Sequence, residues 1–68
     1  MNLRQLGYFV AIAEEGNIGR AAKRLHLSQP PLTRQLHQLE SDVGALLFVR
    51  SRRGVELTVA GRVLLEDA

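Results

Sequence analysis

The stretch that decides the fold reads Ala21-Ala22-Lys23-Arg24-Leu25-His26-Leu27-Ser28-Gln29-Pro30-Pro31-Leu32-Thr33-Arg34-Gln35-Leu36-His37-Gln38-Leu39-Glu40. Its second half and the residues just beyond carry an apolar stripe at helical spacing, formed by Leu32, Leu36, Leu39 and Val43. The stripe predicts a helix that begins near Gln29 and is stopped by Gly44. Pro30 and Pro31 fit its first turn, because backbone N–H groups there have no intrahelical partner.

The same prolines leave two interpretations of the helix cap. If Ser28 is the N-cap, the N–H groups it would normally bind belong to Pro30 and Pro31 and do not exist. Either Gln29 caps the helix, or Ser28 keeps a free hydroxyl at the helix start. A free hydroxyl in that place would be a suitable ligand for a phosphate.

Two shorter helices are predicted before this one. Residues 3–15 carry an apolar stripe formed by Leu3, Leu6, Val10 and Ala13 and widened by Phe9, and Gly16 ends the segment. Asn17 is a good N-cap for a second helix, whose apolar face consists of Ile18, Ala21, Ala22 and Leu25. The small Ala21 and Ala22 allow the following helix to cross closely, with His26 and Leu27 as the connection. This is the helix-turn-helix plan.

A hairpin and a further helix are predicted after Gly44. Residues 46–50 and 55–57 are expected to be short strands, joined by 51–54 with Gly54 supplying the turn. Thr58 can cap a helix that begins at Val59. No C-cap residue precedes Ala68, so we expect the sequence to be cut within this helix. The predicted class is mainly α, with a three-helix core and a two-stranded β wing.

Composition narrows the possible functions. A chain of 68 residues is one domain at most, and 46% apolar residues are typical of a globular one. It has no Cys, and its two His cannot form a zinc site alone, so we expect no metal and no disulfide. No residue set for catalysis or cofactor binding is present, which predicts a protein that is not an enzyme. No membrane span or signal peptide is recognisable, so a cytoplasmic location is expected.

The net charge of +2 is unevenly distributed. Residues 20–53 hold seven Lys and Arg against two Asp and Glu, a local charge of +5, whereas residues 1–19 carry −1 and residues 54–68 carry −2. This pattern indicates an oriented surface for a polyanion, with an ordinary solvated surface as the alternative.

The polar face of the predicted third helix suits DNA bases. Turned away from the apolar stripe are Gln29, Thr33, Arg34, His37 and Gln38. Arg pairs with guanine and Gln with adenine, and Thr offers both a hydroxyl and a methyl group. The hairpin adds Arg50, Arg52 and Arg53, which suit a narrow minor groove or phosphates.

The quoted stretch strongly resembles the N-terminal domain of LysR-type transcriptional regulators. Two later segments resemble the wing and the start of the linker helix in that family, namely Gly44-Ala45-Leu46-Leu47-Phe48-Val49-Arg50 and Leu57-Thr58-Val59-Ala60-Gly61. Ser-Gln-Pro-Pro combined with Arg-Arg-Gly-Val-Glu-Leu-Thr looks most similar to regulators of catechol and chlorocatechol degradation. The resemblance implies a DNA-binding domain over residues 1–58 and the beginning of a linker helix over 59–68.

The resemblance also implies which residues contact DNA. Together with the polar face described above, it predicts a site made of Ser28, Gln29, Pro30, Pro31, Thr33, Arg34, His37, Arg52 and Arg53. Arg50 can serve the fold through an ion pair instead, and Glu14, Glu15, Glu66 and Asp67 are expected to be solvated helix ends. Gly19 stands where many members have Ser or Thr, which removes a possible phosphate contact.

Partners follow from the same resemblance. We expect sequence-specific binding to double-stranded DNA at inverted-repeat half-sites of a promoter or operator. In the family, the linker helix forms the homo-oligomer and a C-terminal domain, absent from this chain, binds a small-molecule inducer. The alternative is a winged-helix module for protein–protein contact without DNA readout, against which the basic wing and polar helix face argue.

Overall fold

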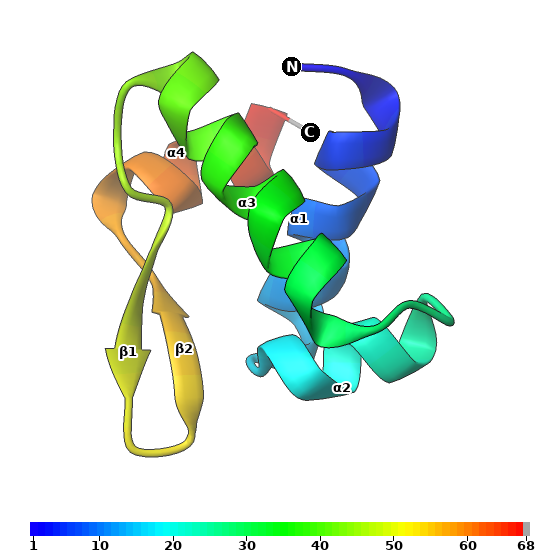
Figure 1. Ribbon diagram of the computed structural model, residues 1–68. Coiled ribbons are helices and arrows are strands. Elements are labelled where there is room, and N and C mark those ends of the chain that lie inside the picture. Colours follow the sequence, from blue (N-terminus) through cyan, green and yellow to red (C-terminus); the bar gives the residue numbers. More distant parts are fainter. Residues whose placement is uncertain (68) are drawn as a thin grey trace.

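The computed structural model describes residues 1–67, and within them four helices accompany one two-stranded sheet (Figure 1). In chain order these are α1 Leu3–Glu15, α2 Ile18–Arg24, α3 Gln29–Val43, β1 Phe48–Ser51, β2 Gly54–Leu57 and α4 Val59–Asp67. This is the predicted order of a three-helix core, a hairpin wing and a further helix. The expectation about the chain end at Ala68 lies outside the described residues.

Capping fixes the limits of the first three helices where the sequence predicts them. Asn17 caps α2, its Oδ1 accepting the N–H of Arg20 at 2.9 Å. Gly16 ends α1 and Gly44 ends α3, each with a positive φ that glycine adopts without steric cost. The sequence analysis did not identify Asn2, whose Oδ1 caps α1 by accepting the N–H of Gln5 at 2.8 Å.

The core lies where the three helices meet the base of the wing. Its largest fully buried side chains are Phe9, Ile12, Leu32, Leu39 and Leu47. The rings of Phe9 and Phe48 are 5.4 Å apart and tilted by 45°, an aromatic contact that joins α1 to β1. Ala21 and Ala22 are buried in α2, which confirms the small residues predicted at the helix crossing.

The predicted apolar stripe of α1 holds at Phe9, which is buried, and at Val10 and Ala13, which pack half-buried against the core, but it was wrong at Leu3. The residues buried in α1 are Gln5, Phe9, Ala11 and Ile12, whereas Leu3 is 87% exposed. Neighbouring elements cover α1 on the side centred on Phe9 and Ile12, and Leu3 in the first turn lies beyond their reach. Val43, the last residue of the predicted α3 stripe, is also exposed, because the chain leaves the core there.

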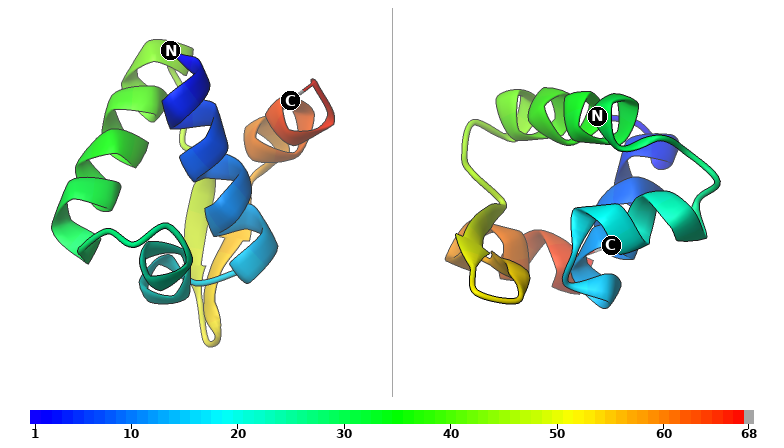
Figure 2. Two further views of the ribbon diagram at one scale, coloured as in Figure 1. Left: turned by 90° about the vertical axis from the view of Figure 1, so that its right-hand side faces the viewer. Right: turned by 60° about the horizontal axis from the view of Figure 1, so that its bottom comes forward.

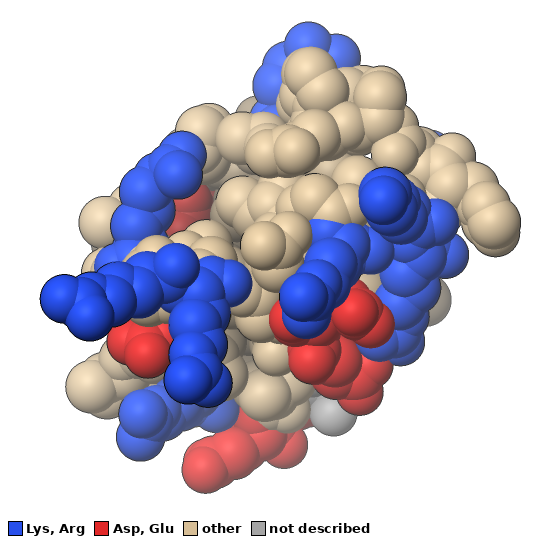
Figure 3. All heavy atoms as spheres, turned by 90° about the horizontal axis from the view of Figure 1, so that it is seen from below, with Lys and Arg blue, Asp and Glu red and all other residues tan. Residues whose placement is uncertain are grey.

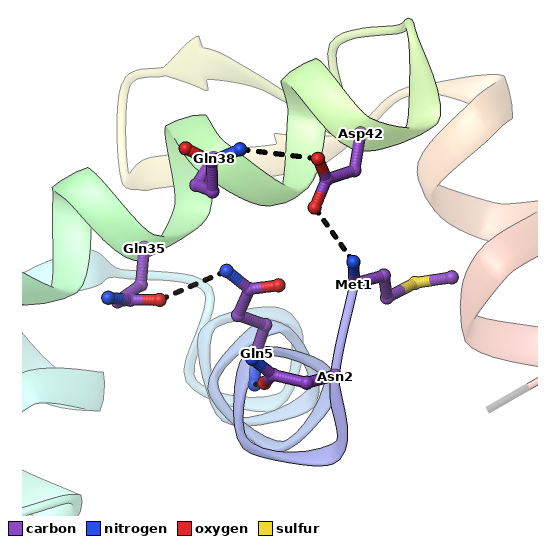
Figure 4. Close-up of polar contacts among 6 residues, drawn as sticks. All are labelled: Met1, Asn2, Gln5, Gln35, Gln38 and Asp42. Atoms are coloured by element: carbon purple, nitrogen blue, oxygen red, sulfur yellow. Dashed lines mark hydrogen bonds and ion pairs between the residues drawn. The ribbon is translucent and has the colours of Figure 1, made fainter.

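Polar contacts between α1 and α3 complete the helical packing (Figure 4). The Gln5 side chain is buried and donates through Nε2 to Oε1 of Gln35 at 3.1 Å. The N-terminal ammonium of Met1 lies 2.8 Å from Oδ2 of Asp42, and Gln38 donates to Oδ1 of the same carboxylate. These contacts, the ammonium first, lower the pKa of Asp42.

The wing differs from prediction in where its first strand begins. We predicted a strand from Leu46, but pairing starts at Phe48, opposite Leu57. The N–H of Leu47 donates instead to Oε2 of Glu40, which takes it out of the strand ladder. Pairing continues to Ser51 and Gly54, so only residues 52 and 53 form the loop.

Gly54 lets the wing approach the helices. Its φ is +142°, and a Cβ atom there would lie 2.2 Å from the carbonyl oxygen of Gly16, so only glycine fits. The adjacent N–H of Val55 donates to that carbonyl at 3.0 Å. The predicted role of Gly54 in the turn is confirmed, and the wing is attached to the α1–α2 turn.

Thr58 links the end of the wing to α4. Its Oγ1 accepts the N–H of Gly61 at 3.0 Å, which confirms the predicted cap, and donates to the carbonyl of Leu46 at 2.6 Å. None of the helices in residues 1–67 is long and apolar enough to cross a membrane.

Candidate nucleic-acid interface

Three elements present polar and basic side chains at one end of the molecule. The tip of the wing, α2 and the N-terminal end of α3 all reach the lower end in Figure 1, and the turned views agree (Figure 2). Viewed onto that end, Lys and Arg side chains project on both sides of the face, some of them beside acidic atoms (Figure 3). The face is therefore basic along its edges and polar or apolar between them.

The start of α3 agrees with the second interpretation of its cap, in which Ser28 keeps a free hydroxyl. Ser28 occupies the N-cap position in extended conformation, and its side chain makes no cap hydrogen bond. Gln29 is the first helical residue, followed by Pro30 and Pro31, which have no N–H to offer. Ser28 is exposed, so its hydroxyl is available to an external acceptor or donor at the helix start.

The predicted reading face of α3 is available to a ligand. Gln29, Arg34 and His37 are exposed and Thr33 is half-buried. Within residues 1–67 these four side chains form no hydrogen bond or ion pair. Gln38 differs, because it is engaged with Asp42. Of the prolines, Pro30 is exposed and Pro31 half-buried.

A groove runs between α3 and β1. Gln29, Thr33 and His37 line its helical wall, and Val49 and Arg50 line its strand wall. Arg50 therefore faces the predicted site residues, and it has no ion-pair partner among the described residues. The ion pair considered for Arg50 in the sequence analysis is not observed there.

The remaining predicted residues lie outside this groove. Arg52 and Arg53 are exposed in the two-residue loop at the tip of the wing. Arg34 is exposed on α3 and does not line the groove. The predicted site thus falls into two parts, the first turns of α3 and the wing tip, with the groove between them.

One arginine of the basic segment 20–53 is ion-paired with carboxylates of the same domain. Arg24 lies 2.7 Å from Oε1 of Glu14 and 3.3 Å from Oε2 of Glu15, and these hydrogen bonds, that to Glu14 first, raise the pKa of Arg24. Glu14 is exposed at the end of α1, as expected, but Glu14 and Glu15 also bind Arg24, because α2 begins directly after α1 ends and brings Arg24 back beside them. Arg20 and Lys23 on α2 remain exposed without ion pairs in the described part of the chain.

Gly19 borders the reading face from α2. A Cβ atom there would lie 3.5 Å from Oε1 of Gln29 and 3.2 Å from Oδ1 of Asn17. A Cβ atom at this position would be in ordinary van der Waals contact with Gln29 and in a tighter contact with the capping oxygen of Asn17. Without a Cβ atom, Gly19 makes neither contact.

Sequence reasoning overlooked Glu40. It is buried at 9% exposure, and its carboxylate accepts the N–H of Leu47 at 2.7 Å. The available signal was its position four residues after Leu36, which places an acidic side chain beside the apolar stripe.

The arrangement is that of a winged helix-turn-helix domain. The chain belongs to the lysR family of bacterial regulatory helix-turn-helix proteins, whose family model matches residues 3–62. It is 66% identical over all 68 residues to the HTH-type transcriptional regulator ClcR of Pseudomonas putida, and 68% identical to TfdS of Cupriavidus pinatubonensis. The chain spans 23% of the length of each of these relatives.

Solved structures agree with this assignment. The CbnR DNA-binding domain in its complex with DNA superposes with a TM-score of 0.93 at 61% identity, over 98% of this chain and 77% of that one. The BenM DNA-binding domain with catB site 1 DNA gives a TM-score of 0.93 at 42% identity, over 98% of this chain and 74% of that one. The predicted fold class and the predicted family are both confirmed.

Proposed function

We propose that this domain binds double-stranded DNA sequence-specifically, with α3 in the major groove and the wing at the minor groove or backbone. The observation that carries the proposal combines two features: Gln29, Thr33 and Arg34 on α3 have no side-chain partner within residues 1–67, and the arginines at the tip of the wing are exposed. Side chains with free donors at a helix start are what base edges require. Exposed wing arginines provide the charge that phosphates attract.

Each predicted site residue has a role in this proposal. Arg34 would bind guanine, Gln29 adenine, and Thr33 would offer its hydroxyl and methyl group. Ser28 would bind phosphate through its free hydroxyl. Supporting roles fall to the other members of the site: Pro30 and Pro31 stiffen the helix start, His37 lies at the edge of the interface, and Arg52 and Arg53 bind the minor groove or backbone.

Relatives with DNA in their solved structures support this function. The CbnR domain was solved as a complex with DNA, and the BenM domain as complexes with catB and benA site DNA. At 61% and 42% identity the docking of those domains is a fair guide for this one. We also propose that residues 1–58 form the DNA-binding unit and that α4 begins the linker helix.

For the parent protein we propose a cytoplasmic LysR-type regulator of aromatic catabolism that acts without enzymatic activity. It would form a homo-oligomer through the linker helix, bind inverted-repeat half-sites, and respond to a small inducer through a further domain. A relative from Acinetobacter lwoffii, 53% identical over 68 residues, is described as a probable cat1 operon transcriptional activator, which favours activation.

Titration with duplex DNA at several salt concentrations tests the proposal. The probes are a duplex enriched from a random pool by the domain and a scrambled duplex of the same composition. We expect tighter binding to the enriched duplex and a steep loss of affinity with salt. Arg53→Ala should reduce the salt slope by about 1 if Arg53 neutralises a phosphate. Weak, salt-independent binding to both duplexes would favour the protein–protein module instead.

A further inference from the structure

Glu40 receives three backbone N–H groups from the segment that joins α3 to the wing. Its carbonyl accepts from Gly44 at 2.8 Å and from Ala45 at 3.2 Å, and its side-chain Oε2 accepts from Leu47 at 2.7 Å. A helix end normally uses only the carbonyl in this way. The side-chain contact therefore adds a directional connection between the recognition helix and the wing.

Burial makes this contact unusual. Glu40 is 9% exposed and lines the groove between α3 and β1, beneath the predicted DNA face. Taking a carboxylate out of water is unfavourable unless hydrogen bonds replace the lost solvation. An apolar side chain would fill the same space without that penalty, but it would leave the N–H of Leu47 without an acceptor.

Leu47 precedes β1 and contacts the residues at which α4 begins. It is fully buried, and its carbonyl accepts the N–H of Thr58 at 3.0 Å. Gly61 lies so close to the same carbonyl that a Cβ atom would come within 2.2 Å of it. A shift of Leu47 relative to α3 would therefore also move β1, which begins at the next residue, and the start of α4, which contacts the Leu47 carbonyl.

Besides the packing of Phe48 on Phe9 at its base, the wing makes one other hydrogen bond to the α1–α3 part of the fold within residues 1–67, from the N–H of Val55 to the carbonyl of Gly16. The hydrogen bonds at Leu47 and Val55 hold the hairpin at two separate points, and without the first the wing can tilt about the second and about the packing of Phe48. Arg53 lies two residues from Val55, about 7 Å along an extended chain. A rotation of about 25° around Val55 would move Arg53 by about 3 Å, which exceeds the tolerance of a hydrogen bond.

We propose that Glu40 is a positioning residue for DNA binding, which holds the wing at the angle that lets Arg53 reach the DNA while α3 occupies the major groove. The inference rests on the proposed function, because it needs both the helix and the wing to contact one duplex. Glu40 itself does not touch the DNA. It acts through the N–H of Leu47.

A double-mutant comparison tests the proposal in the 68-residue chain, with the enriched duplex as probe. In the wild-type background, Arg53→Ala and Arg34→Ala should each lower affinity, by about fivefold or more. In the Glu40→Ala background, Arg53→Ala should change affinity less than twofold, while Arg34→Ala keeps its full effect. Glu40→Gln should restore the Arg53 effect, because the amide oxygen still accepts from Leu47.

Two measurements separate positioning from a general loss of fold. Hydrogen exchange at the Leu47 amide should be slow in the wild type and in Glu40→Gln, and fast in Glu40→Ala. If Glu40→Ala does not fold, Glu40→Asp serves in its place, since the shorter side chain holds its carboxylate further from Leu47. Circular dichroism establishes that each compared variant is folded.

The outcomes distinguish this inference from the proposed function. An undiminished Arg53→Ala effect in the folded Glu40 variant would overturn the positioning role and leave DNA binding intact. Absence of any effect of both Arg34→Ala and Arg53→Ala in the wild-type background would instead remove the proposed function. A loss of the Arg34 and Arg53 effects together in the Glu40 variant would also contradict the inference, because the wing alone should be uncoupled.

Discussion

At the scale of single residues, the interface depends on side chains that the fold leaves unengaged. Arg24 and Arg34 are both exposed arginines on the helix-turn-helix, but Arg24 is bound to two glutamates, whereas Arg34 has no partner in the part of the chain that the structure describes. An arginine already held by carboxylates must break those contacts to bind a base or phosphate. Arg34 therefore offers its donors to DNA at a lower cost than Arg24.

Replacing Arg34 by alanine should weaken binding to the enriched duplex by about 1–3 kcal/mol and relax the base preference at one position. The measurement is a titration against duplexes that vary at each base pair. Arg4→Ala is the matched control, because Arg4 is also exposed but lies in the first turn of α1, near the chain start at the opposite end of the molecule (Figure 1). Equal losses on enriched and scrambled DNA would mean that Arg34 binds only phosphate.

Two glycines on helices should respond in opposite ways to alanine. Gly61→Ala places a methyl group 2.2 Å from the carbonyl oxygen of Leu47 and should destabilise the domain by about 1–3 kcal/mol. Gly7→Ala meets nothing within 4 Å and should stabilise it by about 0.5–1 kcal/mol, because alanine favours the helix. Urea unfolding measures both. A stable Gly61→Ala protein would mean that α4 can move away from Leu47 without loss.

At the scale of elements, much of the structure follows from local sequence signals. Asn17, Gly16, Gly44 and Thr58 mark helix limits through their own backbone or side-chain geometry, and all four act where predicted. Burial is harder to predict, because it depends on which elements pack against a helix. The exposed Leu3 and the buried Gln5 of α1 show this, since periodicity alone favours the opposite arrangement.

In the candidate site, too, some features could be predicted from local sequence signals and others depend on how the elements pack. The reading face of α3 could be identified from the spacing of its polar side chains, since the apolar stripe defines the opposite side. The pairing of Arg24 with Glu14 and Glu15 requires knowledge of the angle between α1 and α2. The contact between Glu40 and Leu47 likewise depends on how the chain turns after Gly44, which no local pattern specifies.

The two helix caps of the helix-turn-helix should differ in what they contribute. Asn17→Ala removes the hydrogen bond to Arg20 and should cost about 1 kcal/mol of stability. Ser28→Ala removes no cap bond and should leave stability almost unchanged, while it weakens binding to enriched and scrambled duplexes alike. Thermal unfolding and DNA titration on the same samples give both values. A large stability loss in Ser28→Ala would mean that its hydroxyl supports the fold.

At the scale of the whole molecule, the domain has the dimensions of a unit that binds one half-site. Its principal extents are 27 × 25 × 18 Å. Half-sites on one face of DNA are separated by about 34 Å or a multiple of it. Two copies can therefore lie side by side on the duplex, each with its own helix in the major groove, and any connection between them must come from outside this interface.

The chain alone should be a monomer. The exposed large apolar residues in the described part of α4 are Val59, 81% exposed, and Val63, 54% exposed, whereas a stable association buries roughly 1,000 Å². Sedimentation at micromolar concentration should give 7.6 kDa, and a duplex with two half-sites should bind two copies without cooperativity. A dimer under these conditions would show that the first turns of α4 already suffice for association.

The paired prolines at the start of α3 also determine how the interface can be observed. Pro30 and Pro31 carry no amide proton, so an amide-detected nuclear magnetic resonance spectrum is silent at two consecutive positions of the predicted contact. Side-chain reporters beside the silent pair are the amide of Gln29 and the methyl group of Thr33. Their signals should shift by more on addition of DNA than the backbone signals of α1 do.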